Sequence, residues 1–381
     1  MENNENNNNN NNSTNFKKAK ELKYPARKKF WGQTSYSALI GQNNNYFDEF
    51  DFDVNVNENN INANNTTEED SSLYKFKEEL LQKNSNAENY YNFYNSNASS
   101  DSDFMLFQNV YIFVQKYIPK GAKVGTFIHS LLETLANKNF ITTDKVLNEI
   151  NLLQKLQSSG ITLFKNINSV DDENYKNFVS WLKIICQTPL LSNNFTLPSL
   201  EEISKNQLSI RTEIEFILPV NEIKIDELTN IINSMDFIKH LPQNFPRESL
   251  KVSKINGLLK GFIDLLICYE NKYYVLDYKS NYIGDNFADY NATNYEKIIL
   301  SHRYDVQAAL YQLALHRLLK WRLPNYNPKQ HLGGTLFYFL RGVNSFSLQN
   351  NNSINSGIYH IEANCESIIK MDNLFNSKNK K

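Results

Sequence analysis

The chain has 381 residues, of which 41% are hydrophobic, so it is long enough and apolar enough to form at least one sizeable core. Its formal net charge of −1 excludes the chain-wide basic excess of proteins that coat nucleic acid, so any phosphate contact must be local. About half of the basic residues that could contact phosphate are explained by a solvated surface alone. These candidates are Lys251, Lys254, Lys260, Arg303, Arg317, Lys320 and Arg322.

The cysteine pattern and the hydropathy exclude further classes of protein. The three cysteines lie far apart and lack any C-x-x-C spacing, which supports neither a disulfide framework nor a zinc or iron–sulfur site. No apolar run approaches the roughly 20 residues that span a bilayer, and the N-terminus is rich in asparagine. We therefore expect a cytoplasmic protein without a membrane segment.

Composition divides the chain into three parts. We expect residues 1–29 to be a disordered Asn-rich head and residues 30–103 to be a tether with low-complexity loops, because such polar segments bury too little apolar surface to offset chain entropy. Within the tether, residues 30–39 form an aromatic and aliphatic island that is predicted to dock on the folded domain or on a partner. Residues 104–381 are expected to form the folded domain.

Hydrophobic periodicity in the folded part predicts an α/β domain. The expected elements, in chain order, are helices at 125–137 and 174–186, a strand at 208–220, a hairpin of strands 257–269 and 273–279, a long amphipathic helix at about 295–322 and a strand at 334–340. Pro219 is expected to end the first strand and Pro324 the long helix. This order predicts a mixed β-sheet flanked by helices.

The predicted hairpin places two acidic residues opposite each other. If Glu270 and Asn271 form a two-residue turn, Tyr269 pairs with Lys272, and counting back along both strands sets Asp264 against Asp277. Like charges in that position repel each other and favour a bound cation. We therefore expect that Asp264→Asn preserves or raises the stability of the metal-free protein.

Lys279 follows Asp277 by two residues, so the strand period returns it to the same face. Two carboxylates beside an ammonium group suit magnesium or manganese and a phosphate, although a structural Asp–Lys ion pair explains this spacing too. Lys279 would then orient the attacking water or stabilise the transition state. His129 on the first helix is ambiguous by itself, because a lone helical histidine is more often packed than a ligand.

Several motifs, in order along the chain, resemble the RecB nuclease family, the C-terminal nuclease domain of exodeoxyribonuclease V beta subunits. The main ones are Gly261–Asp264, Leu276–Asn281 and His302–Tyr311. The similarity also covers Gly125–Glu133, Glu213–Phe216, Leu315–Arg317 and Gly333–Gly342, and Thr34–Ser37 resembles the tether between the helicase and nuclease parts of that protein.

The resemblance implies the PD-(D/E)xK restriction-endonuclease-like fold and a set of site residues. The implied catalytic residues are Asp264, Asp277 and Lys279. The implied metal ligands are His129, Asp264, Asp277 and the Tyr278 backbone carbonyl. The implied supporting or DNA-contacting residues are Glu133, Glu215, Gln307 and Tyr311. A simple surface charge explains Glu133 equally well, and ordinary helix packing explains Tyr311 equally well.

The resemblance further implies a magnesium-dependent exodeoxyribonuclease, with manganese as the alternative metal, that acts on DNA in double-strand-break repair and recombination. RecC-like and RecD-like subunits are the implied partners. The chain has no G-x-x-x-x-G-K-[ST] loop, so we expect no ATP site and a helicase part supplied in trans. The alternatives are a catalytically silent DNA-binding or scaffold remnant of a split gene, and a standalone nuclease.

Overall fold

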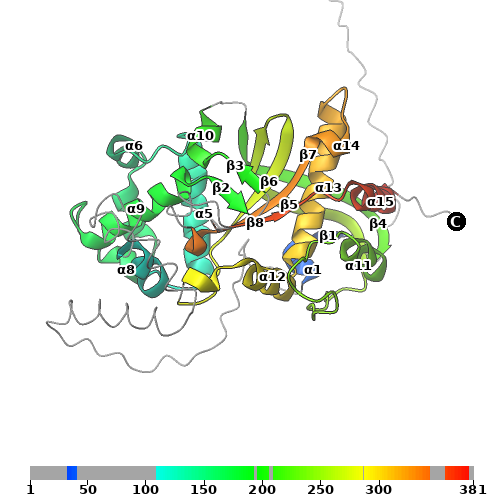
Figure 1. The fold of residues 1–381 in the computed structure, drawn as a ribbon, viewed down its shortest axis with the longest axis horizontal. Helices are drawn as coiled ribbons and strands as arrows, with labels where there is room; N and C mark the ends of the chain where they lie inside the picture. Colours follow the sequence, from blue (N-terminus) through cyan, green and yellow to red (C-terminus); the bar gives the residue numbers. More distant parts are fainter. Residues whose placement is uncertain are drawn as a thin grey trace, which may run out of the picture.

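The computed structural model describes residues 32–40, 109–192, 195–205, 209–285, 287–343 and 357–376. The expected Asn-rich head and most of the expected tether lie outside these ranges. The described part is a mixed β-sheet flanked by helices, which confirms the predicted α/β class (Figure 1). None of its helices combines the length and the apolar character that a membrane span needs.

Strand β5 (Lys254–Tyr269) pairs with three other strands of the sheet. Strand β4 (Ile210–Lys224) runs antiparallel along one edge of β5. The other edge is shared by β1 (Gly32–Ser35), which is parallel to the first half of β5, and by β6 (Lys272–Lys279), which is antiparallel to its second half. The hairpin predicted at 257–279 is therefore confirmed.

Two further strands extend the sheet beyond β6. Strand β7 (Leu332–Phe339) pairs parallel to β6, and β8 (Ile358–Ile361) pairs antiparallel to β7. A separate short hairpin consists of β2 (Leu190–Ser192) and β3 (Phe195–Leu197). Parallel and antiparallel pairs thus occur in one sheet, as predicted.

Helices cover both faces of the sheet, and each face has its own apolar core. One core contains helices α5 (Ala122–Ala136), α6 (Asp144–Glu149), α7 (Leu152–Ser158), α8 (Thr162–Lys165), α9 (Glu173–Gln187) and α10 (Leu200–Ser204) and the π-helix η1 (Phe113–Tyr117). The other contains α1 (Tyr36–Leu39), α11 (Ile225–Asn233), α12 (Ala292–Ser301), α13 (Tyr304–Arg322) and α15 (Cys365–Asn376). In Figure 1, α5 and α13 accordingly lie on opposite sides of the strands. The remaining short elements are α14 (Pro328–His331) and the 3₁₀ turns η2 (Phe287–Asp289) and η3 (Leu340–Gly342).

The prediction that Pro219 ends its strand is wrong. Strand β4 continues to Lys224, and Pro219 is paired with Leu258. Within the described sheet β4 pairs only with β5, so it is an edge strand, where a residue without a backbone N–H is tolerated.

The prediction of a single long amphipathic helix at 295–322 is also wrong, because this range contains parts of two helices, α12 and α13. Arg303, between α12 and α13, adopts a left-handed conformation with φ of 57°, which interrupts the helix. Its guanidinium donates to the Asp305 carboxylate at 3.0 Å and to the Glu248 carbonyl at 2.7 Å, and these bonds fix the break. Every residue from Tyr304 to His316 is buried, so the first part of α13 is a core helix and has no exposed face.

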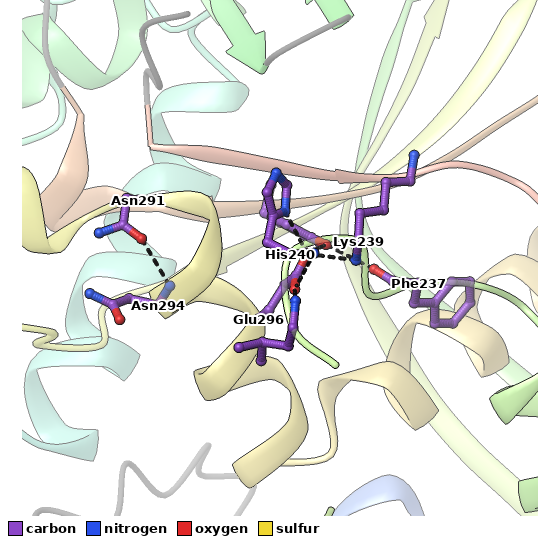
Figure 2. Close-up of polar contacts among 8 residues, drawn as sticks. Phe237, Lys239, His240, Asn291, Asn294 and Glu296 are labelled. Carbon is purple, nitrogen blue, oxygen red and sulfur yellow. Dashed lines mark hydrogen bonds and ion pairs between the residues drawn. The ribbon is translucent and has the colours of Figure 1, made fainter. Parts of the chain in front are cut away.

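A buried carboxylate anchors the loop after α11. Glu296 on α12 is fully buried and accepts hydrogen bonds from the successive backbone N–H groups of Lys239, His240 and Leu241 at 2.8–3.0 Å (Figure 2). The Tyr359 hydroxyl donates to it at 2.7 Å. Burial alone would raise the pKa of Glu296, but these donors outweigh it and lower the pKa.

Residues 32–40 of the N-terminal island pack on the folded domain. Strand β1 adds to the sheet beside β5, and Leu39 is buried at 1% exposure in the α13-side core. The Leu39 carbonyl accepts from the Lys251 amide at 3.0 Å, and the Tyr36 hydroxyl donates to the His302 carbonyl at 2.5 Å. The island is therefore part of the core, although more than 60 residues separate it from the next described residue.

We expect Leu39→Ala to lower the free energy of unfolding by about 2–4 kcal/mol, because it removes a fully buried side chain and leaves a cavity. Urea unfolding of the full chain measures this loss. The half-buried neighbour Ser37, changed to alanine, is the control and should have a much smaller effect. Equal stabilities of wild type and Leu39→Ala would mean that the island does not dock in solution.

Candidate active site

The β5–β6 hairpin has the predicted register. Five residue pairs connect the strands, from Tyr269 with Lys272 to Leu265 with Leu276. The turn residues Glu270 and Asn271 have φ of 47° and 62°, which is the left-handed geometry of a two-residue type I′ turn. The next step along this register is Asp264 and Asp277, just beyond the last paired residues.

At Asp264 the regular alternation of side chains between the two faces of the sheet is interrupted in β5. Ile263 packs in the α13-side core and Leu265 in the α5-side core, although a regular strand would turn both to the same face. On β4, Glu213 lies between the pairs on either side of Asp264 and has a left-handed φ of 47°. The Asp264 carboxylate accepts from the Tyr278 backbone N–H at 2.9 Å, so it reaches β6 through its side chain.

Asp264 forms its closest charged contact with His129 from α5. Imidazole Nδ1 and carboxylate Oδ2 lie 3.3 Å apart, and both side chains are mostly buried. The Tyr278 ring packs edge-on against the imidazole, with centroids 5.7 Å apart, which orients His129. Burial by itself would raise the pKa of Asp264, but His129, the Tyr278 amide and Lys279 outweigh it and hold the pKa below its usual range.

Asp277 and Lys279 form a buried ion pair on the α13 side of the sheet. Their Oδ2 and Nζ atoms are 2.7 Å apart, and the residues are 0% and 1% exposed. Helix α13 satisfies the remaining polar atoms, since Gln307 donates to Asp277 Oδ1 at 3.0 Å and accepts from Lys279 at 3.1 Å. Tyr311 donates to the same carboxylate oxygen at 3.2 Å. The predicted Gln307 and Tyr311 pair thus braces β6.

The expected repulsion between the two carboxylates is not what the structure contains. Asp264 is held by His129 and the Tyr278 amide, whereas Asp277 is held by Lys279 and α13. The side-chain directions separate at the irregular position in β5, so each carboxylate has its own partners. The expectation failed because it assumed an unbroken alternation of faces.

The acidic residue on β4 that joins this cluster is Glu213, which the sequence did not single out. Its pKa is raised to about 7 by desolvation, by Asp264 and by Glu133, and His129 opposes these effects. Glu215, the residue implied by the resemblance, instead pairs with Lys260 at 2.8 Å. The sequence offered both glutamates at alternate positions, and only the left-handed conformation of Glu213 decides which one approaches Asp264.

The donor set suits a hard divalent cation, although it is not assembled. An imidazole and two carboxylates are the types of ligand that magnesium and manganese accept. Within the described residues, however, no three His, Cys, Asp or Glu side chains form a group ready to hold a metal ion. His129 and Asp264 are in contact, and Asp277 would have to exchange its bond to Lys279 for the metal.

Several residues of the proposed basic footprint have other roles. Arg303 is buried against Asp305, Lys260 pairs with Glu215, and Arg317 and Lys320 both pair with Asp372. The exposed members are Lys251, Lys254, Lys320 and Arg322, and of these Lys320 is held by its pair with Asp372. The local charge available for phosphate is thus smaller than the sequence suggested.

Comparison with known proteins gives a consistent set of relatives. No protein-family model matches the chain. Subunit RecB of the RecBCD enzyme is 35% identical over 227 residues in Buchnera aphidicola subsp. Schizaphis graminum, 34% over 258 residues in Escherichia coli K12 and 31% over 258 residues in Haemophilus influenzae. These matches cover 59%, 68% and 68% of this chain but only 17%, 19% and 19% of the relatives, so the chain spans less than a fifth of their length.

We expect Asp264→Asn to lower the free energy of unfolding at pH 7, without divalent ions, by about 1–3 kcal/mol. Because the pKa of Asp264 is lower in the folded protein, the charged carboxylate stabilises the fold at a pH above 3.8, the pKa of the unfolded chain. This stabilisation is lost as the pH falls through the pKa of the folded state. Urea unfolding between neutral and acidic pH checks both statements. The exposed Asp171→Asn is the control. A more stable Asp264→Asn protein would reinstate the repulsion between the carboxylates.

We expect Glu213→Gln to be more stable than wild type at pH 8 and to lose this advantage below the pKa of about 7. A raised pKa stabilises the fold at low pH, and this contribution is lost as the pH rises through the folded value. The effect should be small because the residue is exposed. Melting temperatures across this range measure it. Glu215→Gln is the matched control, and the same pH dependence in both variants would contradict the assignment.

Proposed function

Because this chain carries a RecB-related nuclease region, we propose that it is a magnesium-dependent DNA nuclease that hydrolyses phosphodiester bonds. The observation that carries the proposal is the position of two ionic contacts at one end of the β5–β6 hairpin. The Asp277–Lys279 pair and the Asp264–His129 contact meet at Tyr278, whose amide binds Asp264. Acidic residues and a lysine on adjacent strands of a mixed sheet also support a PD-(D/E)xK core.

The proposed metal ligands are His129, Asp264, Asp277 and the Tyr278 carbonyl. A bound magnesium or manganese ion would lower the pKa of a coordinated water and offset charge on the phosphate. Lys279 would donate hydrogen bonds to the phosphate oxygens as negative charge develops on them. Since Lys279 is 1% exposed, DNA binding must loosen its ion pair with Asp277.

The cellular role that we propose is exonucleolytic processing of DNA in double-strand-break repair and recombination, in the cytoplasm. The relatives are named as subunits of the RecBCD enzyme, which supports partners like RecC and RecD. We further propose that a helicase part is supplied in trans. The chain by itself would act on single strands or ends, and ATP would not stimulate it.

We expect the purified full chain to digest linear single-stranded DNA with magnesium and to stop when the metal is chelated. Lys279→Met should reduce the cleavage rate by about 100- to 1000-fold, because it removes a donor to the developing phosphate charge. Release of acid-soluble nucleotides measures the rate. The matched control is Lys272→Met, which changes an exposed lysine on the same strand.

The outcomes separate the alternatives. Equal cleavage by wild type and Lys279→Met would place the activity at another site or in a contaminant. Absence of cleavage by folded wild type, together with retained DNA binding, would favour the catalytically silent scaffold.

A further inference from the structure

The Lys279 ammonium has a third neighbour besides Asp277 and Gln307. Its Nζ lies 3.7 Å from the centre of the Tyr304 ring, and the Phe337 ring is farther away at 5.5 Å. Tyr304 is the first residue of α13 and is 5% exposed, so this cation–π contact is largely shielded from water. The lysine thus lies between a carboxylate, an amide oxygen and an aromatic face.

The Tyr304 ring is itself held in place. The His302 ring stacks on it with centroids 5.2 Å apart and an interplanar angle of 26°. The His302 carbonyl accepts a hydrogen bond from the Tyr36 hydroxyl of the docked N-terminal island. A continuous series of contacts therefore leads from Tyr36 through His302 and Tyr304 to Lys279.

We infer that Tyr304 is a positioning residue for Lys279, braced by His302 and the docked island. The inference rests on the proposed function, in which Asp277 leaves Lys279 to bind metal. A lysine has a flexible four-carbon stem, so without its carboxylate partner the ammonium needs another restraint. An aromatic face holds the cation without neutralising it and leaves its N–H groups available for a phosphate.

A general structural role of Tyr304 predicts something different. If the ring only filled the core, its removal would lower stability without a selective effect on the chemical step. If it positions Lys279, its removal lowers kcat while KM for DNA stays nearly constant, because the lysine acts in the transition state. Tyr304→Phe retains an aromatic face and should rescue the activity, whereas Tyr304→Leu should not.

The first experiment is NMR on the full chain with labelled lysine, using Lys279→Arg to assign the Lys279 signal. An aromatic face at 3.7 Å shifts the Lys279 Cε protons upfield. The shift should persist in Tyr304→Phe and disappear in Tyr304→Leu and in Tyr304→Met, a second ring-free variant whose flexible side chain fills the gap with less strain. A Lys279 signal that does not move in a folded ring-free variant overturns the inference.

The second experiment measures kcat and KM for single-stranded DNA. Tyr304→Leu should lower kcat by about 10- to 100-fold, since small misplacements of a reacting group cost this much, with KM within about twofold. The matched control is Tyr326→Leu, which removes a tyrosine that contacts His316 near the far end of α13. Tyr36→Phe removes the hydrogen bond to the His302 carbonyl and should give a smaller loss of kcat. An unchanged kcat in this variant would mean that the island does not help to hold Tyr304.

Wild-type kcat in Tyr304→Leu, or an equal loss in Tyr326→Leu, would overturn the positioning role. Absence of cleavage by wild type would instead defeat the proposed function, and the NMR result would still decide whether the Tyr304 ring lies against Lys279.

Discussion

The buried ion pair between Asp277 and Lys279 is the interaction on which the rest of the site depends. Removing two charges from water costs several kcal/mol per ion, and attraction between them compensates only when their other polar atoms are also satisfied. Gln307 and Tyr311 supply those hydrogen bonds, and both come from α13. The first three turns of α13 are therefore buried against the sheet, and the helix cannot shift without exposing the pair.

That constraint explains the neighbouring architecture. Helix α13 must begin at Tyr304 to place Gln307 beside β6, and the left-handed Arg303 lets the chain turn there from α12. The bonds of Arg303 to Asp305 and to the Glu248 carbonyl stabilise the turn, and Glu296 anchors the same loop region to α12. Polar groups with many partners thus hold the α12–α13 corner, which carries the ring that covers Lys279.

The preceding contacts all lie on the α13 side of the sheet. The irregular position in β5 adds contacts from the α5 side to the site. Asp264 turns toward α5 and His129, while Asp277 stays with α13. Contacts from both layers therefore converge on the three residues Asp277, Tyr278 and Lys279.

The sequence by itself determined the hairpin register and the common face of Asp277 and Lys279, because a two-residue turn and a strand period of two are local properties. It left open whether the apolar island packs on the folded domain or on a partner. Only the tertiary structure decided that Glu213 and not Glu215 approaches Asp264, and that each carboxylate has its own partner. The left-handed residue Glu213 changes which side chains of its strand point to each face of the sheet. Packing between segments that are distant in the sequence stabilises this conformation, so a local sequence pattern cannot predict it.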